Sequence, residues 1–316
     1  MQSILERERR LSDINAQDLA SILFRGKDRF LRVQALCQLV KQHIGPNDPK
    51  LYEMSRKDLY AAVQERVAKM KMQTEDGVID GDDPYHELFV LSNFHYPGSV
   101  GSFMSYNVIK TLGTDEQKAQ WLPRIKKNVY YLCYAQTELG TGNDVQNLET
   151  LAVYDMKTKT FELHSPTTSS MKWWPGDLGL ASNFALVVAN VVSNGKFQGV
   201  HTFMVQIRDL QTHKPLPGVE IGDIGPKMGF TSKDNGFLRL THFKIPENQL
   251  LSKYLEIDSD GNIKTKGNPR RMYAGMMAMR CALLIITYTD LFKGATIATR
   301  YSLYRTQFKD SKGAPI

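Results

Sequence analysis

The chain has 316 residues, of which 42% are hydrophobic and 23% charged, an ordinary composition for a globular protein. Its formal charge of +7 is spread along the sequence, which suits anionic ligands and argues against a nucleic-acid partner. Three distant cysteines, the lack of an apolar run of about 18 residues and the lack of a signal-peptide core argue against a secreted or transmembrane protein. We expect an intracellular, reducing compartment.

Helical periodicity dominates the first 130 residues. Apolar residues recur every three or four positions at 31–40 and 59–70, and Ser55 is a candidate N-cap for the second of these helices. A capping box at 114–117 begins another helix, which we expect Pro123 to end.

From residue 131 the sequence reads as strands. Segments 151–155 and 160–164 flank a four-residue turn and predict a hairpin, and further strands are predicted at 184–192, 199–207 and 237–245. No helical segment separates these strands, which indicates an antiparallel barrel or sandwich.

Helical periodicity returns after the Asn-Pro pair at 268–269, a natural N-cap and first turn, and continues to about Phe308. The expected fold class is α+β, with an N-terminal helical domain at 1–130, a β-barrel domain at 131–267 and the first long helix of an incomplete C-terminal helical domain at 268–316. That helix carries apolar residues such as Leu283, Leu284 and Ile286, so we expect a homodimer contact, a partner chain or aggregation.

Several motifs imitate binding sites without completing them. Gly140-x-Gly142 begins like a dinucleotide fingerprint but has Val145 in place of the third glycine. Residues 256–267 imitate a calcium loop but end in glycine rather than glutamate, so a hairpin turn around Asp260 is predicted instead. The histidines lack metal-ligand spacing and no serine elbow occurs, so no metal site is expected.

Two glycine-punctuated stretches remain, YAQTELGTGNDVQNLET at 134–150 and KWWPGDLG at 172–179. A flavin needs hydrogen bonds to its ring edges, a flat apolar wall and close backbone approach. These stretches offer the groups for all three: Thr137, Gly140, Gly142, Trp174 and Gly176. On the residues alone, core tryptophans and ordinary turns explain the pattern equally well.

The motifs as a set resemble the flavin-dependent acyl-CoA oxidases, relatives of the acyl-CoA dehydrogenases, over essentially the whole chain. The matching stretches are CYAQTELG at 133–140, LET at 148–150, SPT at 165–167, KWWPG at 172–176, HKPLPG at 213–218, GDIGPKMG at 222–229, DNGFL at 234–238, IP at 245–246 and RYSLYRTQF at 300–308.

The resemblance implies a helical domain, a β-barrel and a second helical domain, with FAD at their junction in a dimer. Thr137 would bond the flavin pyrimidine edge, Trp174 would line the ring, and the Gly176 amide would face N5. Arg305 would bind the pyrophosphate of the partner subunit's FAD, a role suited to a forked, always-charged donor. Arg280 would border the CoA end of the cleft, or be a solvated helix charge.

The family dehydrogenates acyl-CoA and passes the electrons to oxygen, and its glutamate base lies in a region beyond this chain. No catalytic residue is therefore assigned, and Glu138 is not the family's base. Four positions depart from the family pattern: Thr141, Asn147, Asp177 and Leu180. Asp177 replaces a glycine, and its charge would disfavour the anionic reduced flavin.

Two functions are compatible with these residues. The first is a FAD-dependent acyl-CoA oxidase of fatty-acid β-oxidation. The alternative is a catalytically inactive, truncated paralogue that serves as a scaffold or assembly subunit. We expect the isolated chain to form no peroxide from acyl-CoA, and to hold FAD weakly or not at all unless a partner is present. The resemblance implies the peroxisome, with a mitochondrial complex as the alternative.

Overall fold

The structure is a computed structural model that describes residues 2–43, 49–75, 100–267, 274–303, 305 and 307–314. The chain forms two compact units. One consists of Met1–Asn47, Lys69–Asn93 and Arg280–Ile316, and the other of Asp48–Ala68 and Phe94–Met279. Each unit is described by itself, and the three domains predicted from the sequence stay a prediction.

The described residues before 130 are helical, as predicted: α1 (Gln2–Leu11), α2 (Ala16–Leu23), α3 (Lys27–His43), the 3-10 helix η1 (Pro49–Tyr52), α4 (Arg56–Glu75), α6 (Val100–Leu112) and α7 (Asp115–Lys126). The Ser55 cap of α4 is confirmed, because Ser55 Oγ accepts a hydrogen bond from Asp58 N at 3.2 Å. The α7 capping box is confirmed too: Gln117 N donates to Thr114 Oγ1 at 3.2 Å, and Thr114 N to Gln117 Oε1 at 3.0 Å.

Two predicted helix ends are wrong. Helix α7 continues past Pro123 to Lys126, because Trp121 and Ile125 on either side of the proline are buried and offset one lost helix bond. Helix α8 (Ala274–Ser302) ends before Phe308, and at its last turn the Ser302 hydroxyl donates to Thr299 O. The predicted cap at 268–269 lies outside the described residues.

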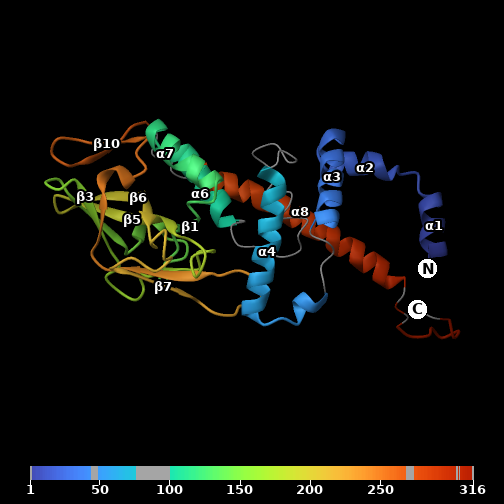
Figure 1. Cartoon of the computed structure of the whole chain (residues 1–316). Helices are drawn as coiled ribbons and strands as arrows, with labels where there is room; N and C mark the ends of the chain where they lie inside the picture. The colour runs from blue at the N-terminus through green and yellow to red at the C-terminus, as the bar shows by residue number, and fades with distance from the viewer. Residues whose placement is uncertain are drawn as a thin grey trace. The chain divides into compact units, whose positions relative to one another are not determined.

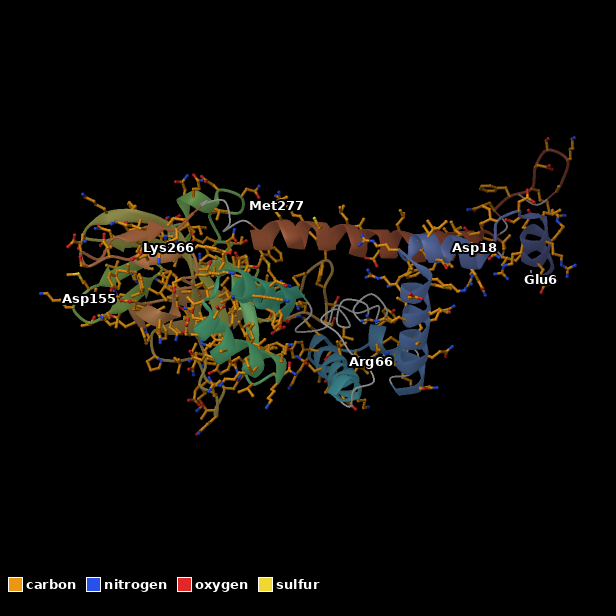
Figure 2. All side chains as sticks on the ribbon, turned by 90° about the horizontal axis from the view of Figure 1, so that it is seen from above. Glu6, Asp18, Arg66, Asp155, Lys266 and Met277 are labelled. Atoms are coloured by element: carbon orange, nitrogen blue, oxygen red, sulfur yellow. The ribbon has the colours of Figure 1, made fainter. Side chains whose placement is uncertain are left out.

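The main sheet is mixed, with six strands: β1 (Leu132–Ala135), β2 (Leu151–Asp155), β3 (Thr160–His164), β5 (Phe184–Ser193), β6 (Lys196–Gln206) and β9 (Phe243–Pro246). The hairpin of β2 and β3 forms with the predicted bounds, and Figure 2 shows Asp155 at the outer edge of the strand-rich body. The purely antiparallel sheet was a wrong expectation, because β1 and β2 both run parallel to β5. The described strands form a mixed α+β fold in which a closed barrel is not seen.

Strand β5 organises this sheet. Strand β6 pairs along its full length on one edge, with a bulge between Val191 and Val192. On the other edge β1 pairs with the first half of β5, up to Val187, and β2 pairs with the second half, from Asn190. The loop 136–150, which joins β1 to β2, therefore leaves and rejoins the same edge of one strand.

A second sheet has the order β4 (Lys172–Trp173), β8 (Gly236–Leu240) and β7 (Val219–Asp223). The single strand predicted at 237–245 is therefore two strands in different sheets. His242, with φ +46°, turns the chain between β8 and β9. The hairpin turn predicted at Asp260 is confirmed by the antiparallel pair β10 (Leu255–Ile257) and β11 (Ile263–Thr265).

Two hydrophobic clusters hold together the unit formed by Asp48–Ala68 and Phe94–Met279. One lies between the strands and includes Phe161, Phe203 and Leu238, each with no exposed surface. The other joins α6 and α7 to β1, β5 and β6 through Ile109, Trp121 and Leu186. Figure 1 shows α6 and α7 alongside these strands. No helix among the described residues is long and apolar enough to cross a membrane.

Candidate flavin-binding site

The two glycine-punctuated stretches lie side by side. Three backbone hydrogen bonds of 2.9 Å join the first stretch to the second and to the residues just before it: Trp173 N to Thr137 O, Leu139 N to Met171 O, and Gly140 N to Ser169 O. The loop after β1 therefore lies alongside β4 and bonds to it as a further strand would. Because backbone bonds fix this register, ligand groups on one stretch are positioned relative to those on the other.

Glu138 sits at the centre of this junction and is fully buried. Lys172 Nζ lies 2.8 Å from its Oε1, and the amide and hydroxyl of Thr150 donate to the same oxygen at 2.9 and 2.5 Å. The amide of Glu149 donates to Oε2 at 2.7 Å. Burial lowers the pKa of Lys172 to about 8 against the attraction of Glu138. Four donors saturate this carboxylate, so it cross-links the junction and is not available as a base.

Three predicted cofactor groups remain open to a ligand. Within the described part of the chain, neither the Thr137 hydroxyl nor the Gly176 amide takes part in a hydrogen bond, and both residues are half-buried. Trp174 is 53% exposed, with φ +79°. Its neighbour Trp173 is different, because its ring stacks on Phe237 at 5.9 Å between centroids. The exposed indole is therefore that of Trp174, and its predicted role in lining a flavin ring stays a prediction.

The other two glycines differ from one another. The amide of Gly140 already donates to Ser169 O, and a Cβ there would lie 2.7 Å from Ser169 Cβ. The expectation that this amide is free for a ligand is wrong, because tight packing explains the glycine. At Gly142 a Cβ would meet no atom within 4 Å, so the backbone there is open to approach.

The segment 233–236 is hydrogen-bonded to the loop 174–181. Its backbone and side-chain bonds are Asn235 Nδ2 to Trp174 O at 2.7 Å, Gly236 N to Pro175 O at 3.0 Å, and Gly179 N to Asp234 O at 3.0 Å. The amides of Leu180 and Ala181 both donate to Asp234 Oδ2 at 2.9 Å. The departure at Leu180 is tolerated because its backbone, not its side chain, makes this contact.

Arg208, just beyond β6, also holds this loop in place. Its guanidinium donates to the carbonyl oxygens of Leu178 at 3.0 Å, Gly179 at 2.9 Å and Ser182. Burial lowers the pKa of this guanidinium, opposed by the nearby acidic groups of Cys133 and then Asp234. A forked, always-charged donor suits three carbonyls that converge on one point.

Asp177 departs from the family pattern without adding an unpaired charge. It has no exposed surface, and its Oδ1 lies 2.7 Å from Lys233 Nζ, which is also buried. The expectation that Asp177 presents a bare negative charge to the site is therefore wrong. Asp234 lies close by, and burial together with the charge of Asp177 raises its pKa to about 6.

The two predicted arginines belong to the other unit. Arg280 is exposed on α8. Arg305 is exposed beyond the end of that helix, and its amide donates to Tyr301 O at 3.0 Å. Leu283 and Leu284 are exposed as predicted, by 49% and 71%, whereas the side chain of Ile286 lies outside what the structure describes. Among the described residues no cluster of His, Cys, Asp and Glu could hold a metal ion.

Sequence reasoning missed three residues of this site: Lys233, Asp234 and Arg208. Asp234 lies in the DNGFL stretch that was matched to the family, so its presence in a motif was a usable signal. Lys233 and Arg208 carry no local pattern, since their partners lie 56 and 26 to 30 residues away (233 minus 177 for the first pair).

Comparisons with known proteins identify the relatives of this chain. The acyl-coenzyme A oxidase N-terminal family model matches residues 15–130, and the acyl-CoA oxidase C-alpha1 domain model matches residues 273–315. The chain belongs to the acyl-CoA oxidase family.

Particular relatives extend the match. Mouse peroxisomal acyl-coenzyme A oxidase 2 is 40% identical over 306 residues, which cover 96% of this chain and 45% of the relative. Human peroxisomal acyl-coenzyme A oxidase 1 is 36% identical over 313 residues, which cover 98% of this chain and 47% of the relative. The tomato acyl-CoA oxidase structure superposes with a TM-score of 0.92 at 33% identity, covering 98% of this chain and 48% of that one. Acyl-CoA oxidase-2 of Caenorhabditis elegans, bound with FAD, ascaroside-CoA and ATP, has a TM-score of 0.90 at 32% identity, covering 99% and 48%. The chain spans about half the length of these relatives.

Proposed function

We propose that this chain carries the flavin-binding part of a FAD-dependent acyl-CoA oxidase of fatty-acid β-oxidation. The observation that carries the proposal is the pair of polar groups left open, the Thr137 hydroxyl and the Gly176 amide, on two stretches held in one register. The Caenorhabditis elegans relative is an acyl-CoA oxidase bound with FAD, ascaroside-CoA and ATP, so FAD and a fatty acyl-CoA are the ligands proposed here.

The residues of the site fit this cofactor. The Thr137 hydroxyl would bond the pyrimidine edge of the flavin, the Gly176 amide would donate toward N5, and the exposed Trp174 indole would cover the ring. Gly142 offers open backbone, while Gly140 holds the loop by its packing on Ser169. FAD, when bound, supplies the acceptor that turns acyl-CoA into trans-2-enoyl-CoA, and its reoxidation by O2 gives H2O2.

The remaining roles are proposed from the family. Arg305 would bind the pyrophosphate of FAD in a partner subunit, and Arg280 would border the CoA end of the cleft. Glu138 is excluded as the base because four donors saturate it. The named relatives are peroxisomal enzymes, so we propose the peroxisome as the compartment, and no observation supports the mitochondrial alternative.

A titration with FAD tests the proposal, with binding followed by quenching of flavin fluorescence. We expect saturable though weak binding by the chain, and Thr137→Ala should raise the Kd about tenfold, the effect of one lost hydrogen bond. Thr158→Ala is the matched control, because its hydroxyl bonds Asp155 and Thr160 at the hairpin turn, away from the proposed site. The absence of saturable binding, or an equal effect of both variants, would contradict the flavin site.

A further inference from the structure

The Asp177–Lys233 ion pair lies directly behind the loop that carries Gly176. A Cβ at Gly176 would lie 2.7 Å from Lys233 Cε and 3.6 Å from its Nζ, so the lysine chain packs against the backbone of that glycine. Lys233 Nζ reaches past it to Asp177 Oδ1 at 2.7 Å. Both side chains are almost completely buried, so water does not screen the pair.

Asp177 is an unfavourable residue for this position unless something compensates it. Its φ of +70° lies in the left-handed region, where a glycine is the usual choice. Its carboxylate is also removed from water, which costs several kcal/mol for an unpaired ion, by order of magnitude. Lys233 supplies the compensating charge from a segment 56 residues away (233 minus 177).

The carbonyl oxygen of Lys233 fixes this lysine in place. Lys227 Nζ donates to it at 2.9 Å, and the Arg56 guanidinium donates to it at 3.3 Å while holding Asp223 at 2.7 Å. The backbone of Lys233 is thus anchored by two cations. Its ammonium position is set by the ion pair and by the Gly176 backbone.

We propose that Lys233 is a positioning residue of the cofactor site, which holds Asp177 and cancels its charge behind the Gly176 amide. This inference rests on the proposed flavin-binding function and deepens it. The loop of this chain carries a balanced pair where the family pattern has an uncharged glycine. The pair therefore adds no net charge to the loop behind the Gly176 amide.

A double-mutant cycle on the full chain tests the inference, with Lys233→Met, Asp177→Gly and the double variant. The readouts are the Kd values for oxidised and reduced FAD at about pH 8, where Asp234 is ionised. Lys233→Met removes the ammonium that faces Asp177 and keeps the carboxylate, so reduced FAD should bind about tenfold more weakly relative to oxidised FAD, a fall in midpoint potential of about 30 mV for a two-electron couple. Asp177→Gly removes the carboxylate and keeps the ammonium, so the ratio should shift by a similar factor in the opposite direction.

The double variant should return the ratio to within about threefold of the parent chain, because neither charge remains. Lys233→Arg, which keeps the charge, should behave like the parent and guards against a folding defect in Lys233→Met. Opposite shifts that cancel support the inference. Shifts of the same sign, or none, overturn it while the proposed function stands. Failure of the parent chain to bind FAD overturns both, and that result is read first.

Discussion

Two buried lysine–carboxylate pairs flank the tryptophan segment in sequence, and they differ in how their carboxylates are satisfied. Glu138 receives four donors, from Lys172, Thr150 and the Glu149 amide. Asp177 is held by Lys233 beside a second buried carboxyl, Asp234. The first pair is saturated, whereas negative charge is crowded at the second.

The difference separates two uses of a buried ion pair. The Glu138 pair ties the backbone of two loops together, so its value is mechanical and should not depend on cofactor. The Asp177 pair sets the charge behind a loop whose Gly176 amide is open, so its value should appear in the redox behaviour of a bound flavin. Four measurements on the protein without cofactor sharpen this comparison, in order of decreasing effect.

Glu138→Gln should produce the largest loss of stability. The substitution keeps the shape of the side chain but leaves the Lys172 ammonium buried without its counter-charge, which typically costs about 3–5 kcal/mol. Urea unfolding followed by tryptophan fluorescence measures the change. Glu162→Gln is the control, because that carboxylate is 33% exposed and bonds only His242. Equal losses in both variants would show that the Glu138 network is not structural.

Asp234 should give the second pair a pH dependence that the first lacks. Its pKa of about 6 in the folded protein lies above the ordinary 3.8, so the folded state binds this proton more tightly than the unfolded state. The stability from this group is greatest below about pH 4 and falls as pH rises through 6, by about 1 kcal/mol between pH 5 and 7. Asp234→Asn should remove that slope in unfolding free energies measured at both pH values. A slope unchanged in the variant would contradict the crowding of charge.

The capping box of α7, a hydrogen-bond network without an ion pair, gives a reference for the stability effects of the two ion pairs. Thr114→Ala removes the hydroxyl that accepts from Gln117 N in the capping box of α7. Loss of such a cap typically costs about 1 kcal/mol, without any dependence on salt. Thermal melts at low and high ionic strength measure it. A salt-dependent loss would show that charge around the helix end, not the cap, is responsible.

An exposed pair should show the smallest effect. Lys264 Nζ lies 3.0 Å from Asp258 Oδ2 on the β10–β11 hairpin, and the lysine side chain is 68% exposed. Water and side-chain entropy offset the attraction between such groups. Lys264→Ala should leave the melting temperature unchanged within replicate scatter. A clear shift would mean that burial is not what distinguishes the two internal pairs.

Local patterns predicted the local elements well. The hairpin at 151–164 alternates between buried and open positions around a four-residue turn, so neighbouring residues determine it. The cap of α4 and the capping box of α7 also depend on residues three positions apart. The parallel pairings of β1 and β2 with β5 join segments 39 to 52 residues apart (190 minus 151 and 184 minus 132), and no local pattern encodes them.

In the site, too, local motifs could be predicted from the sequence and long-range contacts could not. Its open groups, Thr137, Trp174 and Gly176, stand in motifs that sequence alone identified. The partners that shape the site could not be predicted, because Lys233 and Arg208 act on residues far along the chain. The pairing of the Asp177 charge was therefore missed, since an isolated sequence position shows a carboxylate but not its counter-ion.

Both ends of loop 136–150 are attached to the same edge of β5. This arrangement limits which parts of the loop can vary in sequence. The two attachment points, at Val187 and Asn190, lie three residues apart on one strand, or about 10 Å. Asn190 also fastens the returning end, since its amide donates to Thr150 O at 2.9 Å. The sheet thus fixes both ends of the loop, and Glu138 joins its first residues to its last. Changes in its sequence or length are best accommodated near Gly142, where an added Cβ meets no atom within 4 Å, so that this part can diversify while the sheet keeps its register.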